Sequence, residues 1–119
     1  MNLKRLTSEQ REVLTAFQVR VFEGLLKVEK GHVTTYRDLG SYIDCSSSQA
    51  IGQALKRNPF APQIPCHRVV KSDLTLGGFE GSFAKAPAKK SLLENEGVAL
   101  HQNGKGEWCV DSKCLHRFT

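Results

Sequence analysis

The chain has 119 residues, of which 17 are lysine or arginine and 12 are aspartate or glutamate, so its formal net charge is +5 at pH 7. This length suits one domain, residues 1–119, with a core of its own. No secretory signal and no apolar run long enough to cross a bilayer is visible, so we expect no membrane partner and a location in the cytoplasm, nucleoid or nucleus. The basic excess suits a polyanionic partner, although ordinary solubility explains it equally well.

The basic residues gain meaning if they cluster. Several fall near the motifs described below: Lys56, Arg57, Arg68, Lys71, Lys85, Lys89 and Lys90. The four cysteines are Cys45, Cys66, Cys109 and Cys114. They are too few and too irregularly spaced for a disulfide scaffold, which favours free thiols in a reducing compartment.

The first part of the chain has the pattern of an amphipathic helix that is broken once. Thr7 and Ser8 ahead of Glu9 are typical of a capped helix start. Apolar residues follow at helical spacing: Val13, Leu14, Phe17, Val21, Leu25 and Val28. Gly31 is the expected end of this core-forming segment.

Two short helices with a tight link come next, which predicts a helix-turn-helix. The first spans about 36–43, with Leu39, Tyr42 and Ile43 directed inward, and a capping box of Ser46 with Gln49 starts the second, about 47–56. The second helix is rich in small residues: Ser47, Ser48, Ala50, Gly52 and Ala54. A smooth helix fits insertion into a minor groove better than base readout in a major groove, and ordinary helix packing is the alternative.

A thiol, an imidazole and a guanidinium stand together in Ile64-Pro65-Cys66-His67-Arg68-Val69-Val70. The preceding prolines exclude a helix, and the two valines predict a short buried strand, so Cys66 should lie where a rigid turn meets the core. Cysteine has a pKa of about 8.5 and needs a base to become a nucleophile. His67 is the obvious base, with Glu96 and Asn58 as further candidates. Neighbours on a strand face opposite ways, so direct contact between the two side chains requires a backbone turn or a bridging water; a buried structural cysteine is the alternative.

The remaining elements are predicted from local patterns. Residues 71–75 form a turn, and the glycine-rich segment 77–83 carries two aromatic residues that could stack on a flat group or simply shape a loop. Residues 88–97 form a last helix with Leu92 and Leu93 inward and Gly97 as its C-cap. The stretches 98–101 and 107–110 flank Asn103-Gly104, which predicts a terminal hairpin.

These motifs, in this order, resemble the O(6)-alkylguanine-DNA alkyltransferases. The resemblance covers about 17–100, with 101–119 as a C-terminal extension. Its pieces are Gly31-His32-Val33-Thr34-Thr35-Tyr36, Ala50-Ile51-Gly52, Asn58-Pro59, the Pro65-Cys66-His67-Arg68-Val69 signature, Gly77-Gly78-Phe79, and Lys89 with Leu92-Leu93-Glu94-Asn95-Glu96-Gly97. The implied fold is mainly α with short strands, a winged-helix-like helix-turn-helix domain with a small C-terminal hairpin.

The resemblance implies a role for each matching residue at the reaction centre. Cys66 would accept the alkyl group from guanine directly and irreversibly, once per molecule. A water would connect it to His67, which Glu96 orients, while Asn58 braces the turn.

It also implies how damaged DNA would be bound. Tyr36 would stabilise the leaving guanine, the Val69 backbone would recognise the flipped base, and Phe79 would face that base. The helix at 47–56, with Ser48, Gln49, Ala50 and Gly52, would enter the minor groove. Arg37 and Ser72 would touch phosphates.

Three departures from the family pattern stand out. Gln49 replaces the arginine that fills the place of the flipped nucleotide, and Phe79 replaces a tyrosine. The resemblance also begins only at about Phe17, whereas many relatives carry an N-terminal domain that holds their metal sites, so we expect that domain to be absent and expect no metal and no cofactor. Three tail donors, Cys109, Cys114 and His116, are too loosely spaced to predict a zinc site.

The predicted function is single-turnover repair of alkylated guanine in double-stranded DNA. The protein would act as a monomer, with cooperative binding along DNA left open. Three alternatives remain. One is a non-catalytic alkyltransferase-like lesion sensor, which the intact Cys66 disfavours. The others are a plain helix-turn-helix DNA-binding module and a thiol hydrolase, for which no oxyanion-hole segment is evident.

Overall fold

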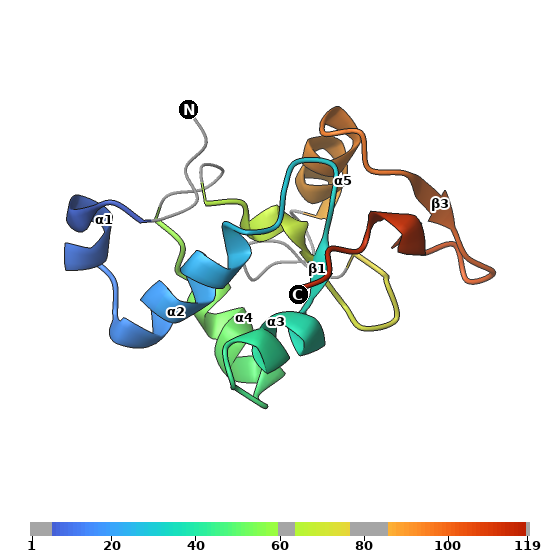
Figure 1. Cartoon of the computed structure of the whole chain (residues 1–119). Helices are drawn as coiled ribbons and strands as arrows, with labels where there is room; N and C mark the ends of the chain where they lie inside the picture. The colour runs from blue at the N-terminus through green and yellow to red at the C-terminus, as the bar shows by residue number, and fades with distance from the viewer. Residues whose placement is uncertain (1–5, 60–63, 77–85, 119) are drawn as a thin grey trace.

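The computed structural model describes residues 6–59, 64–76 and 86–118 (Figure 1). The α-helices are α1 Ser8–Glu12, α2 Ala16–Leu25, α3 Tyr36–Tyr42, α4 Ser48–Lys56 and α5 Ala86–Asn95. The strands are β1 Thr34–Thr35, β2 Val69–Val70, β3 Leu100–Gln102 and β4 Trp108–Val110, and two 3-10 turns are η1 Cys66–Arg68 and η3 Ser112–Cys114. The predicted fold class, mainly helical with short strands, is confirmed. Among the described helices, none is long and apolar enough to span a membrane.

The predicted break in the first helix separates α1 from α2. Thr15 caps α2 in a capping box with Gln18, through bonds of 3.1 Å and 3.0 Å in the two directions. Val13, which lies in the break, is 66% exposed, so its assignment to an inward face was wrong. The helix also ends at Leu25, well before Gly31, although Gly31 does have the positive φ (+90°) expected of it.

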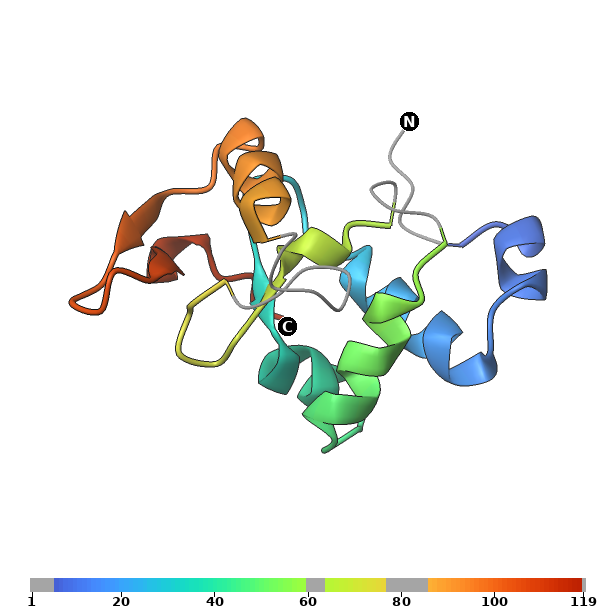
Figure 2. The same cartoon turned by 180° about the vertical axis from the view of Figure 1, so that it is seen from behind.

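The helix-turn-helix is formed by α3 and α4, which lie side by side at one end of the molecule (Figure 2). The cap of α4 is Ser47 rather than the predicted Ser46, since its hydroxyl accepts from the Ala50 amide at 3.1 Å. A glycine is needed at position 40, because a Cβ there would lie 2.5 Å from the carbonyl oxygen of Cys45 in the link. The short link and the close helix approach therefore depend on each other.

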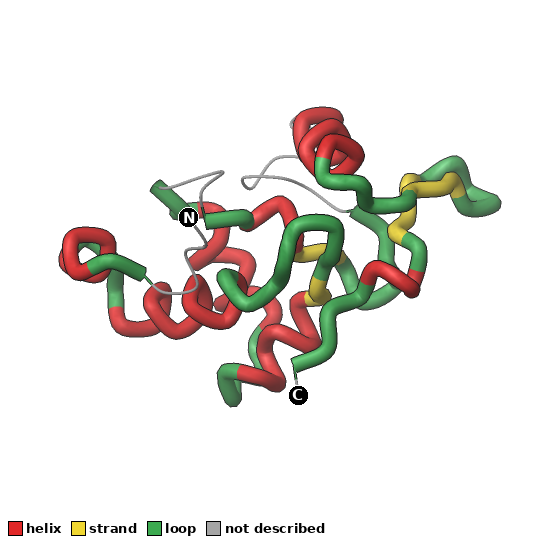
Figure 3. The backbone as a smooth tube through the Cα atoms, turned by 45° about the horizontal axis from the view of Figure 1, so that its top comes forward, coloured by secondary structure: helices red, strands yellow, loops and turns green. Residues whose placement is uncertain are grey.

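The strands form two separate pairs (Figure 3). The pair β1 and β2 is parallel, with Thr34 opposite Val69, and it ties the start of the helix-turn-helix to the cysteine segment. The pair β3 and β4 is antiparallel, with Leu100 opposite Val110, which confirms the predicted terminal hairpin. Gly97, at φ +88°, ends α5 as predicted.

Two apolar clusters make up the core, and β2 belongs to both. The larger includes Cys66 and Val69 with the inner faces of α2, α3 and α4. The smaller includes Val70 with Leu93, beneath the hairpin. Successive side chains on a strand point to opposite faces, so two neighbouring valines serve two cores. The cysteine segment is thereby held from both sides.

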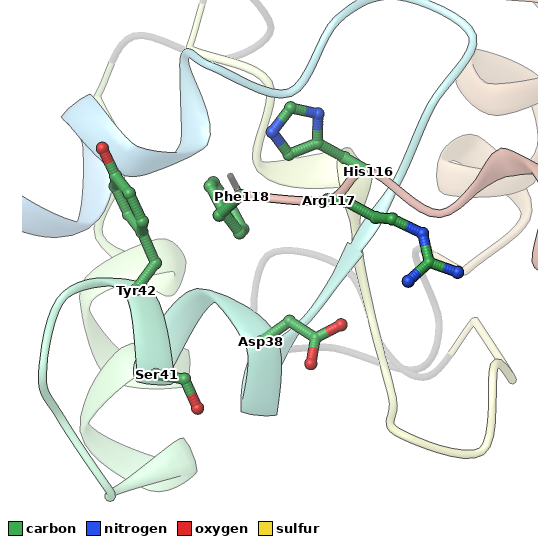
Figure 4. Close-up of a pocket in the computed structure, with 6 residues that line it drawn as sticks. All are labelled: Asp38, Ser41, Tyr42, His116, Arg117 and Phe118. Carbon is green, nitrogen blue, oxygen red and sulfur yellow. The ribbon is translucent and has the colours of Figure 1, made fainter.

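The C-terminal tail lies along the segment that precedes β1. Val33 donates to the Cys114 carbonyl at 2.8 Å and accepts from the His116 amide at 2.7 Å. Tyr42, predicted to point into the core, is 45% exposed and stacks instead on Phe118 of the tail at 4.4 Å between ring centroids. An open pocket of about 560 Å³ lies between α3 and the tail (Figure 4).

Candidate functional site

Cys66 begins the 3-10 turn η1 and is 6% exposed. Its amide donates to the Ile64 carbonyl at 2.9 Å, and its carbonyl accepts from the Val69 amide at the end of η1. The chain becomes a strand only at Val69. Cys66 and His67 therefore occupy a turn instead of opposite faces of a strand, which is the arrangement that contact between thiol and imidazole requires.

Asn58 joins the end of the helix-turn-helix to this turn. Its side-chain Nδ2 donates to the Ile64 carbonyl at 2.8 Å, across the loop that leads to Cys66. Ile64 is itself buried at 1% exposure, so this amide fixes a backbone group two residues before the thiol. The geometry agrees with the bracing role that the family resemblance implies for Asn58.

His67, the residue after Cys66, lies against Glu96. His67 is 2% exposed, and its Nε2 is 3.1 Å from Oε2 of Glu96. Within the described residues, Nδ1 of the same ring has no hydrogen-bond partner. Glu96 thus contacts Nε2 of the imidazole and leaves Nδ1 able to accept a proton.

Arg68 completes this group in a way that the sequence analysis did not assign. Its Nε and Nη2 donate to the two carboxylate oxygens of Glu96 at 2.9 Å and 2.6 Å, and its Nη1 donates to the Val28 carbonyl at 2.8 Å. A bidentate pair of this kind holds the carboxylate in one orientation. Arg68 was predicted to belong to a basic cluster, but it serves the interior.

The electrostatics of the group favour a neutral imidazole. Burial lowers the pKa of His67, and the contact with Glu96 opposes that only in part. Burial also acts to raise the pKa of Glu96, but the hydrogen bonds from Arg68 and His67 outweigh it, and the net pKa is lowered. At neutral pH the arrangement is an ionised carboxylate beside a neutral imidazole that can accept a proton.

Lys89 is a second buried residue to which the sequence analysis gave no role. Its side chain is 1% exposed, and its Nζ donates to the carbonyls of Val69 at 2.7 Å and Leu76 at 2.6 Å. Two sequence signals pointed to this lysine: it is one of the residues that match the family, and it stands two helical turns before Glu96. Both are weak, because lysines on helices are usually exposed.

A shallow pocket gathers three of the predicted binding residues. Tyr36, Ser48 and Ser72 line a space of about 390 Å³, together with Lys71 and Asp73. Burial raises the pKa of the Tyr36 phenol, and the charge of Cys66 raises it further, so phenol and thiol influence each other. Tyr36 is therefore the pocket residue that senses the charge of Cys66.

Except for Ser72, which lies in the turn after β2, the predicted DNA-binding residues lie on α3 and α4. Ser48 and Gln49 of α4 are exposed, Ala50 and Gly52 are partly buried, and Arg37 of α3 is exposed. A Cβ at Gly52 would have nothing within 4 Å. The buried face of α4 consists of Ile51, Ala54 and Leu55. Phe79 and Lys85 lie outside the described residues.

The tail donors Cys109, Cys114 and His116, which were too loosely spaced to predict a zinc site, lie within the described residues. In residues 6–59, 64–76 and 86–118, no three histidine, cysteine, aspartate or glutamate side chains are grouped so that they could hold a metal ion. Cys109 is buried in the hairpin, and Cys114 packs against the smaller core cluster.

The fold and the site define a helix-turn-helix domain whose second helix packs in the same core cluster as a buried cysteine, which a buried histidine paired with a glutamate directly follows. The model of the 6-O-methylguanine DNA methyltransferase DNA-binding domain matches residues 16–98. The chain therefore belongs to the 6-O-methylguanine DNA methyltransferase family.

Curated relatives agree with this assignment. The methylated-DNA–protein-cysteine methyltransferase of Methanothermobacter thermautotrophicus is 42% identical over 72% of this chain and 47% of its own. That of Thermococcus kodakarensis is 43% identical over 73% of this chain and 48% of its own. The chain thus spans about half the length of these relatives.

Solved structures give two kinds of match. The O6-methylguanine-DNA methyltransferase of Pyrococcus kodakaraensis matches 71% of this chain and 47% of its own, with 44% identity and a TM-score of 0.63. S. pombe Atl1, in complex with damaged DNA containing O6-carboxymethylguanine, matches 86% of this chain and 95% of its own, with 27% identity and a TM-score of 0.76. The Atl1 match covers more of this chain.

Proposed function

We propose that this chain repairs DNA by moving an alkyl group from O6 of guanine to Cys66, once per molecule and irreversibly. The observation that supports this most is the position of Cys66, in a turn directly before a neutral imidazole held by Glu96. The two relatives described above are named for this reaction, and about half of the length of each matches this chain. This repair requires access to DNA, so we expect the protein to act in the nucleoid or nucleus.

The first step is formation of the thiolate. His67 would take the thiol proton through Nδ1, directly or through a water, because Nε2 already faces Glu96. The carboxylate would stabilise the resulting imidazolium. Arg68 keeps that carboxylate in place through its two hydrogen bonds.

The second step is displacement at the alkyl carbon. The sulfur forms a bond to that carbon while the bond from carbon to O6 of guanine breaks, and the electron pair moves onto the base. A hydrogen-bond donor next to the base stabilises the developing anion and can supply its proton. Tyr36, which lines the adjacent pocket, is our candidate for that donor. The product is a thioether on Cys66, so one acceptor serves one lesion, and a monomer suffices.

The guanine must leave the duplex to reach a thiol that is only 6% exposed. Flipping a base costs a few kcal/mol, which contacts to the DNA must offset. We infer that α4 approaches the minor groove through its small residues and that Gln49 takes the place of the flipped nucleotide. Arg37 and Ser72 would contact phosphates, and the Val69 backbone would contact the base; Phe79 is expected beside it.

The decisive experiment mixes the protein with a duplex that carries one O6-methylguanine and measures protein mass. We expect one added methyl group, mapped by peptide mass spectrometry to Cys66, and no turnover beyond one equivalent. A methyl group on any other residue, or multiple turnovers, would contradict the mechanism.

A second candidate function is lesion sensing without transfer, which the extensive match to Atl1 favours. It predicts a stable complex with the damaged duplex and no mass increase. The same experiment separates the two functions, since transfer leaves a methyl group on the protein and sensing does not.

A further inference from the structure

We propose that Lys89 is a positioning residue for the acceptor thiol. Its ammonium group holds the carbonyls of Val69 and Leu76, which we call the cysteine frame, and places a positive charge where it favours the Cys66 thiolate. This inference rests on the proposed function, in which that thiolate is the nucleophile.

The hydrogen bonds of Lys89 define the frame. Nζ donates to Val69 at 2.7 Å, at the start of β2, and to Leu76 at 2.6 Å, beyond the turn that follows β2. Both distances are in the range of charge-assisted bonds. One ammonium group therefore joins β2, the strand that directly follows the cysteine turn, to Leu76.

Burial of a lysine requires a compensating interaction. An ammonium group at 1% exposure loses most of its hydration. Burial lowers the pKa of Lys89 to about 8, and the charge of Cys66 acts to raise it. Coupling between two titrating groups is mutual, so the interaction that favours the charged lysine also favours the charged thiol.

The other groups around Cys66 do not supply this charge. His67 has a lowered pKa and is neutral at pH 7, and Tyr36 has a raised pKa and is a neutral phenol. The Arg68 charge is matched by the bidentate bond to Glu96. Lys89, by contrast, bears its charge while bonded to two neutral carbonyl groups, those of Val69 and Leu76.

The helix α5 presents this lysine and the general-base partner on one side. Lys89 lies within α5 and Glu96 directly follows it, two turns further on, so both face the cysteine turn. Glu96 prepares the proton acceptor, and Lys89 prepares the sulfur. One helix would therefore tune both members of the Cys-His pair.

The test compares Lys89→Met with Lys90→Met. Lys90 is the adjacent residue on α5, but it faces outward, where it pairs with Glu94 at 3.0 Å and lies over the Trp108 ring at 4.3 Å. The readout is the rate at which iodoacetamide labels Cys66, followed by peptide mass spectrometry from pH 5 to pH 10. No DNA is needed.

We expect Lys89→Met to raise the midpoint of Cys66 labelling by about one pKa unit, which lowers the rate at pH 7 about tenfold. Lys90→Met should keep the wild-type midpoint, and Lys89→Arg should restore most of the shift, because it keeps the charge. Equal midpoints for the Lys89→Met and Lys90→Met variants would overturn the proposal.

A reciprocal measurement covers the case in which Lys89→Met does not fold. The Lys89 Nζ is titrated by nitrogen NMR in the wild type and in Cys66→Ala. The pKa of Lys89 should fall in the variant, because the thiolate charge that supports the ammonium is gone. An unchanged value would overturn the proposal. Since neither measurement involves alkyl transfer, failure of transfer and failure of this inference are distinct results.

Discussion

The outer face of α4 and the turn η1 with its α5 partners are built on opposite principles. Before Lys56 in its last turn, α4 offers small or uncharged side chains to solvent, and Gly52 has open space beside it. Around η1, by contrast, a buried imidazole pairs with a partly buried carboxylate, and a buried lysine bonds to backbone carbonyls. The surface of α4 is available for a partner, whereas the polar groups around η1 already hold one another.

This contrast predicts a separation of effects. Polar groups at a surface contribute little to stability, because water and salt screen them. Removing one partner of a buried charge pair leaves the other charge unpaired, which lowers the free energy of unfolding by several kcal/mol. Substitutions on α4 should therefore change DNA binding, and those around η1 should change chemistry or stability.

The largest effect is expected for Cys66→Ala. It should abolish alkyl transfer while binding to a duplex with O6-methylguanine stays within a few-fold of wild type, because α4 is untouched. Mass spectrometry and fluorescence anisotropy measure the two properties. Residual transfer in this variant would exclude Cys66 as the acceptor.

Glu96→Ala should destabilise the fold by about 3 kcal/mol, because it leaves the buried His67 and the partly buried Arg68 without their carboxylate. Urea unfolding followed by circular dichroism gives the value. The matched control is Glu94→Ala on the same helix, whose exposed pair with Lys90 should be worth less than about 1 kcal/mol. Equal losses in both variants would contradict the contrast.

Acidification should destabilise the protein through His67. The pKa of His67 in the folded state lies below the unfolded value of about 6.5. The stability that neutral His67 contributes to the folded state is therefore present above that pH and is lost as the pH falls. His67→Gln should therefore flatten the fall in unfolding free energy between pH 7.5 and pH 5, as urea unfolding at each pH would show. His116 also has a lowered pKa but lies nearer the surface, so His116→Gln is the control and should change the slope less.

Gly52→Ala should change stability and DNA affinity in opposite directions. Replacing a helix glycine by alanine stabilises by about 0.5–1 kcal/mol, and no atom obstructs the new methyl group. The same methyl group would hold α4 away from the minor groove, so DNA affinity should fall. Thermal unfolding and a binding titration test this; tighter binding would show that α4 does not approach DNA closely at this residue.

The smallest change in stability is expected for Gln49→Arg, within about 0.5 kcal/mol, since the residue is exposed. Repair of a duplex should nevertheless be faster, because a longer cation better fills the place of the flipped nucleotide. Single-strand repair rates provide the control, as no base stacking opposes access there. Equal acceleration on both substrates would argue against this role.

Much of the fold could be predicted from local patterns. The helix-turn-helix, the hairpin about Asn103 and the C-cap at Gly97 depend on residues close together in the chain, and the structure contains all three. The Cys66-His67-Arg68 motif likewise identified the region of the site and the family. Small errors, such as Ser46 in place of Ser47 as the cap, reflect neighbouring residues with the same capping chemistry.

Only the tertiary structure decided which polar residues turn inward. Arg68 and Lys89 have the composition of surface residues, and their burial depends on the carboxylate of Glu96 and on carbonyls at Val28, Val69 and Leu76. Tyr42 was expected in the core, but it faces outward because the tail brings Phe118 against it. The sequence determined the local elements and the reactive motif, since these need only neighbours; the charge environment of the thiol arises from groups distant in sequence, which only folding brings together.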